Sequence, residues 1–389
     1  MAVITILCLL IIILSILLIK QLNINRNIIF CVLISILIIL FAANINTCIP
    51  AALDGCKLWY KAILPTTFPF VIICNLLISY NGIELYSKIL GPVICRPLGL
   101  SKSCSFPIVA SMLCGYPLGA KYCVDVYSMK YIEKDEFKRL LNIASNVGPL
   151  FLIGSVGAAL LNNTAIGYIM LASCYLSCFV IGIITKKKKD VIYSDHLPSS
   201  KNITPNFGTA IKDAVHNGID TVLTIGGFIV IFSVIISLIK NSQYITYMFG
   251  RLESIFNTDS GILYGMFLGS IEITNGCNII SNLSLSIPLK ASIISFLCSF
   301  SGLAIIAQVS SFVSETNIHY SRYILFKFIQ GIFSFIITYV LTRIIPTSVY
   351  TSSVTATLTN PCLFILPILI LLVLTSACSL INKLFLHVS

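Results

Sequence analysis

Four polar side chains stand in or beside breaks in otherwise apolar sequence, and their chemistry indicates what the chain can do. They are Glu272, Asn275, Lys121 and Asn146. A carboxylate can carry a proton or hold a cation, an ammonium group can pair with an anion, and amides both donate and accept hydrogen bonds. The sequence contains no Gly-rich P-loop, no Gly-x-Ser-x-Gly and no His-Glu-x-x-His in an apolar stretch. These residues therefore favour solute binding over catalysis, and we do not expect an enzyme.

Two short polar interruptions carry three of these residues, one interruption in each half of the chain. The first is CGYPLGAK at residues 114–121, and the second is GSIEITNG at residues 269–276. Hydrocarbon leaves loose backbone N–H and C=O groups without partners, so a broken helix is tolerated there only around a protein-lined or water-filled cavity. Two such breaks in corresponding places indicate the substrate site of an inverted-repeat transporter. The pattern predicts a membrane carrier.

The composition is that of a multi-pass membrane protein. Of 389 residues, 57% are hydrophobic and 10% are charged, whereas soluble domains carry about 25% charged residues. A transmembrane helix needs about 20 mostly apolar residues. We do not interpret the first apolar stretch as a cleavable signal, because it lacks a basic start and an Ala-x-Ala-like site and a second apolar stretch follows. The predicted spans are Val3–Ile19, Ile28–Phe41, Ala62–Ser79, Leu141–Leu160, Ile166–Ile184, Ile219–Ile239, Ala291–Ser310, Tyr323–Val340 and Leu363–Leu380.

The distribution of basic residues predicts the orientation. Four lysines at 186–189 directly follow one span and should stay in the cytoplasm. With both interruptions treated as re-entrant, the N-terminus lies outside and the C-terminus lies in the cytoplasm. The net charge of +11 then follows from topology, and we do not expect nucleic-acid binding. Among the 25 lysine and arginine residues, those left outside are Lys57, Lys61, Lys240, Arg251, Lys290 and Arg343.

The order of elements repeats on either side of a polar linker. Each half is expected to contain a span, an amphipathic stretch, an interruption and two further spans. If the first hairpin enters from the cytoplasm and the second from outside, the halves have the inverted relation of an alternating-access carrier. We therefore predict an all-α polytopic membrane protein with two re-entrant helical hairpins. Its parts are two N-terminal transmembrane helices (1–45), a first repeat (46–185), a cytoplasmic linker (186–207), a second repeat (208–345) and a C-terminal transmembrane helix (346–389).

Cysteine and histidine give no sign of a metal site. The 15 cysteines lie mostly in apolar stretches, and no Cys-x-x-Cys pair accompanies a histidine cluster. We interpret the cysteines as small apolar residues of the core. No metal and no cofactor is expected. Asp213, His216 and Asp220 indicate the interfacial start of the helix that contains Ile219–Ile239.

The two charged candidates each have a second interpretation. An ionisable group at membrane depth costs several kcal/mol, which makes a function for Glu272 the first hypothesis. Glu272 could carry a coupling proton, bind a cation or cap a broken helix. Lys121 could pair with an anionic solute or with a helix end. It could equally be an ordinary cytoplasmic lysine.

The neutral candidates have alternatives as well. Asn142 and Asn146 stand one turn apart on the predicted helix and share a face, where Asn142 contacts either solute or a neighbouring helix. Tyr116 either stacks on an aromatic ring or packs against other residues at the hairpin tip. Free N–H groups at the helix starts after Pro117 and Pro149 suit carboxylates. The predicted binding residues are Gly115, Tyr116, Pro117, Gly119, Lys121, Asn142, Asn146, Gly148, Pro149, Glu272, Thr274, Asn275, Gly276, Ser299 and Ser301.

Several short motifs resemble those of a known family. They are Leu64-Pro65-x-x-Phe68-Pro69-Phe70, Gly115-Tyr116-Pro117-x-Gly119-Ala120-Lys121, Asn146-x-Gly148-Pro149-Leu150-Phe151 and Glu272-Ile273-Thr274-Asn275-Gly276. In this order the chain resembles the YlbJ (SpoVV) family of sporulation integral membrane proteins, over about Ile63 to Thr342. That family belongs with the Gate (nucleoside-recognition) domains and is similar in fold to concentrative nucleoside transporters. The first 45 residues and the tail after Arg343 match no motif.

The resemblance implies a function in an endospore-forming bacterium. The expected function is a transporter that moves dipicolinic acid, a small aromatic dicarboxylate, across the outer forespore membrane toward the forespore. The resemblance does not decide whether the coupling ion is a proton or sodium. It also leaves undecided whether the protein forms a homo-oligomer. The alternatives are a non-transporting membrane scaffold of the spore envelope and a nucleoside-type solute carrier, since a fold alone does not determine its substrate.

Overall fold

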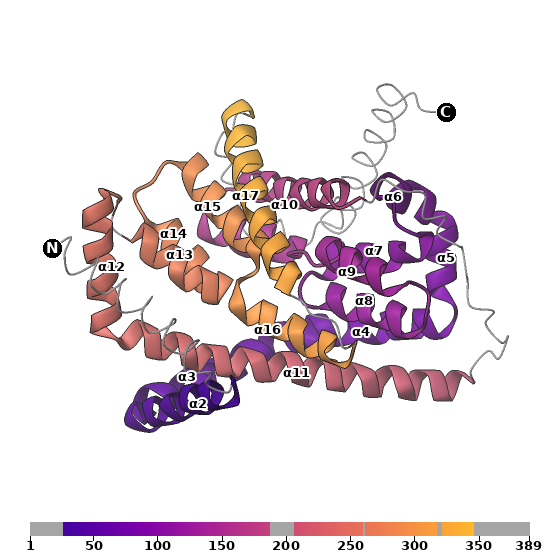
Figure 1. Ribbon diagram of the computed structural model, residues 1–389, viewed down its shortest axis with the longest axis horizontal. Coiled ribbons are helices and arrows are strands. Elements are labelled where there is room, and N and C mark those ends of the chain that lie inside the picture. The colour runs from indigo at the N-terminus through magenta and orange to yellow at the C-terminus, as the bar shows by residue number, and fades with distance from the viewer. Residues whose placement is uncertain (1–25, 187–205, 260, 317–320, 346–389) are drawn as a thin grey trace.

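The computed structural model describes residues 26–186, 206–259, 261–316 and 321–345, and every regular element in these ranges is helical (Figure 1). The all-α class is therefore confirmed. The predicted spans Val3–Ile19 and Leu363–Leu380, the predicted C-terminal part and most of the predicted linker lie outside the described residues.

The first half of the described chain contains two long helices at its ends and short helices between them. A continuous helical stretch of 35 residues, Ile45–Ser79, is followed by shorter elements and then by α10. The bounds are α2 Arg26–Ala43, α3 Ile45–Leu58, η1 Trp59–Ile63, α4 Leu64–Ser79, α5 Gly82–Ile89, α6 Gly91–Leu98, η2 Lys102–Cys104, α7 Ser105–Cys114, α8 Leu118–Ser128, α9 Lys134–Ile143, η3 Leu150–Leu160 and α10 Thr164–Ile184.

The second half has the same order of elements. It begins with α11, also 35 residues long, passes through short helices and ends with the long helix α17. The bounds are α11 Phe207–Asn241, α12 Gln243–Phe256, α13 Ile262–Ile271, α14 Ile273–Asn282, α15 Ile287–Phe300, α16 Gly302–Val313, η4 Ser314–Thr316 and α17 Ser321–Ile344. In each half, two helices of about ten residues form a hairpin: α7 with α8 and α13 with α14.

Five helical stretches of the described chain are long and apolar enough to cross a membrane. They account for several predicted spans, and together with the shorter apolar helices they describe a multi-pass chain. The predicted span Ile219–Ile239 is part of a longer helix, because α11 already begins at Phe207 and so includes Asp213 and Asp220. The candidate stretches are Ile45–Ser79, Thr164–Ile184, Phe207–Asn241, Ile287–Val313 and Ser321–Ile344.

Two predicted spans are broken helices. The prediction of a break at Gly148 and Pro149 is confirmed, because α9 ends at Ile143 and η3 begins only at Leu150. In the predicted span Ala291–Ser310, a break that we did not predict separates α15 from α16. It lies at Ser301, whose φ of 76° is left-handed and therefore ends a right-handed helix. Each half thus has one hairpin followed by one broken helix.

The two long helical stretches pack against each other in antiparallel directions. Trp59 Nε1 donates to the backbone oxygen of Val222 at 3.0 Å, and its ring packs on Gly226. Further along α4, Asn75 Nδ2 lies 3.4 Å from the oxygen of Ala214, near the start of α11. Figure 1 shows α11 along one edge of the molecule with α4 beside it. This pairing joins the two halves.

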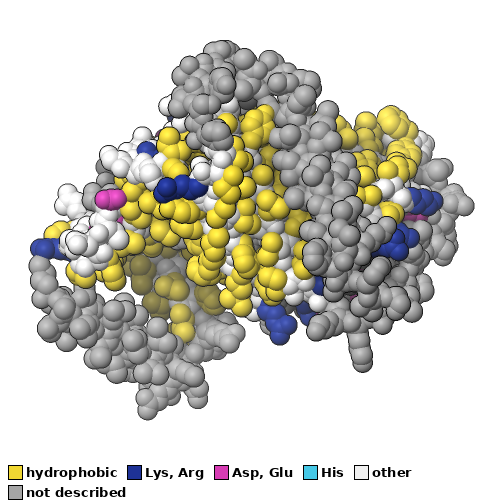
Figure 2. Space-filling model, turned by 90° about the horizontal axis from the view of Figure 1, so that it is seen from above, with side chains coloured by type: hydrophobic (Ala, Val, Ile, Leu, Met, Phe, Trp, Pro, Cys, Tyr) yellow, Lys and Arg dark blue, Asp and Glu magenta, His cyan; other side chains and the backbone are white. Residues whose placement is uncertain are grey.

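Helices α10, α15 and α17 pack on one another. The most apolar part of α10 is 72% buried, whereas that of α11 is 28% buried and exposes isoleucine and leucine side chains. Figure 2 shows a broad hydrophobic surface with lysine and arginine side chains near its margins. Such a surface suits lipid, in which apolar side chains need no cover from other protein.

Candidate functional site

The tip of the first hairpin touches the first helix break. Gly115 follows α7 with φ 79° and ψ −160°, a backbone region that is almost restricted to glycine. A Cβ atom on Gly115 would lie 2.5 Å from the backbone nitrogen of Gly148. Pro117 precedes α8 and Pro149 precedes η3, so these two prolines mark the starts of the next helices. The first interruption and the break at Gly148 and Pro149, which the sequence analysis grouped, are therefore neighbours in the structure.

The tip of the second hairpin is closed by a carboxylate cap. Glu272 accepts hydrogen bonds from the backbone nitrogens of Thr274 at 2.9 Å and Asn275 at 3.0 Å, and from Asn275 Nδ2 at 2.7 Å. These bonds satisfy N–H groups that a helix start leaves without partners. Lys240 Nζ, at the end of α11, donates to Asn275 Oδ1. Of the interpretations of Glu272, the geometry matches the helix cap.

The two halves meet through the first tip. The Tyr116 hydroxyl donates to the backbone oxygens of Cys298 at 3.2 Å and Ser299 at 3.4 Å, at the end of α15. The second break is equally close to its own hairpin, because a Cβ atom on Gly302 would lie 3.1 Å from the backbone oxygen of Gly269. Hairpin tips and helix breaks from both halves therefore converge on one region.

A buried lysine lies in this region, and we did not predict it as a site residue. Lys327, on α17, is completely buried. Its Nζ donates to the backbone oxygen of Ser145 at 2.7 Å and to Gln330 Oε1 at 2.7 Å, and it lies 5.1 Å from the ring centroid of Tyr116. Gln330 Nε2 in turn lies 3.3 Å from Asn146 Oδ1. We call these five residues the central network.

The sequence contained a signal for Lys327. It stands inside the predicted span Tyr323–Val340, and an ionisable group inside a span is a functional candidate. Our topology instead placed Lys327 with the cytoplasmic basic residues, because it lies near the start of the span. The structure buries Lys327 completely, so it is a part of the protein interior to which the sequence analysis gave no role.

The predicted asparagine pair does not share one helix face. Asn142 lies in α9, but α9 ends at Ile143, so Asn146 belongs to the irregular break. Asn146 Nδ2 donates to the oxygen of Ile143 at 2.7 Å, and its backbone nitrogen donates to Ser111 Oγ at 3.1 Å. Asn142 is buried, and its Oδ1 accepts no hydrogen bond from the described residues. The prediction is wrong because α9 ends at Ile143, so the four-residue spacing that places two side chains on one helix face does not extend to Asn146.

The remaining small residues of the predicted site allow close packing. A Cβ atom on Gly119 would meet the backbone oxygen of Ala144, and one on Gly276 would meet the Cα of Gly269. Both hairpins therefore have a glycine where the chain passes close to other backbone. Ser299 and Ser301 are buried on either side of the end of α15, and Thr274 is exposed.

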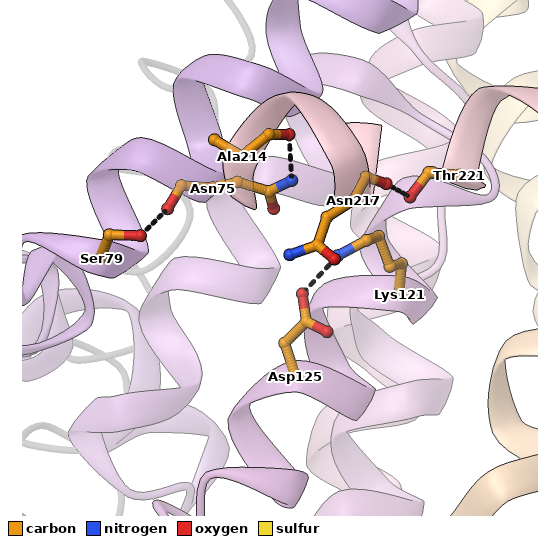
Figure 3. Close-up of polar contacts among 7 residues, drawn as sticks. All are labelled: Asn75, Ser79, Lys121, Asp125, Ala214, Asn217 and Thr221. Atoms are coloured by element: carbon orange, nitrogen blue, oxygen red, sulfur yellow. Dashed lines mark hydrogen bonds and ion pairs between the residues drawn. The ribbon is translucent and has the colours of Figure 1, made fainter. Parts of the chain in front are cut away.

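Lys121 lies apart from the central network. Its Nζ is 2.6 Å from Asp125 Oδ2, one turn further along α8 (Figure 3). Both residues line a cavity of about 480 Å³ between α4 and α8 of the first half and α11 and α16 of the second. The other polar residues of its wall are Asn75, Ser79, Asp213, Asn217, Asp220, Thr221, Thr224 and Ser311. The structure thus separates Lys121 from Tyr116 and Asn146, with which it was grouped.

These features define an all-helical, multi-pass integral membrane protein whose two halves each contain a short hairpin and a broken helix. Residues 60–187 match the Gate family, which is described as nucleoside recognition. The chain is similar to the sporulation integral membrane protein YlbJ of Bacillus subtilis (strain 168), with 26% identity over 306 residues, which are 73% of this chain and 75% of that protein. No solved structure matches the chain. The resemblance drawn from the motifs is therefore confirmed.

Proposed function

We propose that this chain is a secondary carrier that moves a small aromatic dicarboxylate, dipicolinate, by alternating access. The observation that carries the proposal is that the first hairpin tip lies at both helix breaks. Gly115 contacts Gly148, and Tyr116 of the central network bonds to the end of α15, while the second hairpin packs on the break that follows α15. Irregular backbone in an apolar protein is tolerated where it lines a substrate cavity. Motion of one half relative to the other would open and close this region.

The proposed membrane arrangement is an inverted repeat. The equal order of elements in the two halves and the antiparallel packing of α4 and α11 support it. In this arrangement the hairpins α7–α8 and α13–α14 are re-entrant from opposite sides, the N-terminus lies outside and the C-terminus lies in the cytoplasm. The similarity to a sporulation protein supports placement in the outer forespore membrane.

The cavity beside Lys121 is proposed as the vestibule on one side. Its walls come from both halves, and Asp213, Asn217 and Asp220 on α11 are exposed, so the cavity is open to solvent. Lys121 follows Pro117 by four residues, a distance of about 6 Å along a helix. Solute that enters the cavity would therefore come close to the first hairpin tip. A carrier open to one side at a time needs such a one-sided approach.

Uptake into proteoliposomes tests the proposal. Purified full-length protein is reconstituted, and uptake of labelled dipicolinate is compared with that of labelled uridine and with empty liposomes. We expect saturable dipicolinate uptake that is lost when Thr224, an exposed threonine on the cavity wall, is replaced by Trp. The matched control is Thr209→Trp, an exposed threonine on the same helix outside the cavity wall. Coupling is tested by imposing a proton gradient or a sodium gradient in separate runs.

Two other outcomes identify the alternatives. Uptake of uridine without dipicolinate would indicate a nucleoside-type carrier, which the Gate match at residues 60–187 favours. No uptake of either solute would indicate a non-transporting scaffold of the spore envelope. A scaffold should also tolerate substitutions in the hairpins and be sensitive in its surface loops, which is the opposite of the carrier pattern.

A further inference from the structure

We infer that Lys327 is the carboxylate-binding group of the central network, so that the site selects an anionic solute. The inference rests on the proposed carrier function and specifies the chemistry of its solute. Lys327 projects from α17 of the second half to the break of the first half, where it contacts Ser145. Its other partner, Gln330, lies one turn further along α17. It is thus placed where both halves meet.

The first argument is the cost of the buried charge. Lys327 is completely buried, and its two hydrogen-bond partners, a backbone carbonyl and an amide oxygen, are neutral. A buried ammonium group without an anion is strongly unfavourable, because neutral acceptors replace only part of its hydration. No carboxylate of the described chain forms an ion pair with Lys327.

The second argument comes from the sequence outside the described residues. Residues 1–25 and 346–389 contain no aspartate and no glutamate. The segment 187–205 contains Asp190 and Asp195, which stand next to the basic run at 186–189. These two terminal segments therefore have no acidic side chain to offer to Lys327. A carboxylate group of the solute would supply the anion that Lys327 lacks.

The third argument is the remaining donor capacity of the network. A lysine ammonium group has three N–H donors, and Ser145 and Gln330 accept two of them. The third can donate to a carboxylate, and the ring of Tyr116, 5.1 Å from Nζ, offers a face on which an aromatic solute can stack. A planar aromatic carboxylate matches both groups together.

The site also suggests how binding is coupled to motion. The bond from Lys327 to the Ser145 carbonyl ties α17 to the break between α9 and η3. A carboxylate is a stronger acceptor for ammonium than a carbonyl, so it competes for the same donor. Binding would release this tie between the halves. The Tyr116 ring covers Lys327, so the first hairpin tip must move before solute reaches it.

Binding measurements on the full-length protein in lipid nanodiscs test the inference. The probes are dipicolinate, picolinate with one carboxylate, and uncharged 2,6-pyridinedimethanol, each measured by calorimetry and by thermal shift. Lys327→Met removes the charge and keeps an apolar side chain of similar length, which buried sites tolerate. We expect its dipicolinate affinity to fall about tenfold or more, while Lys327→Arg retains part of it. Lys138→Gln, an exposed lysine on α9, should change nothing.

Each outcome decides either the inference or the proposed function. Equal dipicolinate affinity in wild type and Lys327→Met overturns the inference, while dipicolinate uptake by the wild type leaves the carrier function intact. Absence of dipicolinate binding and uptake in the wild type overturns both. If Lys327→Met does not fold, the affinities of the wild-type protein for the three probes test the inference. Equal affinity for dipicolinate and the uncharged analogue would contradict a carboxylate-binding site.

Discussion

Gly115 and Gly148 are in backbone contact, such that a Cβ atom on Gly115 would lie 2.5 Å from the nitrogen of Gly148. One residue closes the first hairpin and the other lies in the break of the next helix. The second half repeats this relationship between Gly302 and the backbone oxygen of Gly269. Because packed backbone leaves no room for adjustment, each hairpin and its neighbouring break should move as one body.

We predict that Gly115→Ala destabilises the protein and stops transport. The φ of 79° and ψ of −160° strain any residue with a Cβ atom, at a cost of about 1–3 kcal/mol, and the clash with Gly148 adds to this. Thermal unfolding in detergent and dipicolinate uptake measure the two effects. The control is Gly227→Ala on α11, where a Cβ atom meets nothing within 4 Å. An unchanged melting temperature in Gly115→Ala would contradict the close contact.

A second prediction concerns the bond that joins the first tip to the second half. Tyr116→Phe removes the hydroxyl that donates to the oxygens of Cys298 and Ser299. We expect a loss of about 0.5–1.5 kcal/mol in stability and a clear fall in uptake rate, since the bond aligns the two halves. Tyr80→Phe is the control, because the Tyr80 side chain is exposed. Equal uptake by both variants would show that the bond has no part in transport.

Much of the fold followed from local patterns. The interruptions at residues 114–121 and 269–276 predicted where the hairpins turn, because Gly and Pro or a capping carboxylate stop a helix wherever it packs. The break at Ser301 was missed, since serine is common within membrane helices and its left-handed φ of 76° depends on packing against the second hairpin. Only the fold imposes that conformation.

The site was harder to predict than the fold. Asn146 and Tyr116 were chosen for their place beside breaks, and the structure brings both into the central network. Lys327 is separated from Ser145 by 182 positions in the sequence, so no local spacing connects them. Lys121 was grouped with the first tip by sequence, yet its side chain turns along α8 to Asp125. Side-chain direction on a helix, and not closeness in sequence, decides such groupings.

A third prediction separates the two remaining functions of Glu272. If Glu272 is a helix cap, Glu272→Gln keeps one acceptor oxygen and loses the other, which lowers stability by about 0.5–2 kcal/mol. If a proton gradient drives uptake in the wild type, uptake by Glu272→Gln should then keep its dependence on external pH. A carboxylate that carries the coupling proton would instead lose this dependence on substitution. Glu133→Gln is the matched control, because Glu133 also precedes a helix but makes no side-chain cap.

The last prediction concerns the ion pair of Lys121 and Asp125 in the wall of the cavity. Lys121 and Asp125 are 2.6 Å apart, with 12% and 25% of their side chains exposed, so the pair is less screened by water than a surface pair. A double-mutant cycle with Lys121→Gln and Asp125→Asn should give a coupling free energy of about 1 kcal/mol in thermal unfolding. The pair Lys57 and Asp54 is the control, with 66% and 73% exposure and an expected coupling near zero.

The same variants show whether Lys121 meets the solute. Its ammonium group is already paired, and Asp213 and Asp220 line the same cavity, which makes the surroundings of Lys121 unfavourable for a dianion. We therefore expect Lys121→Gln and Asp125→Asn to reduce dipicolinate uptake to a similar, small extent, and the double variant to recover part of it. A loss of uptake confined to variants without Lys121 would instead assign this lysine to solute binding, because only a direct contact depends on its charge after Asp125 has been neutralised.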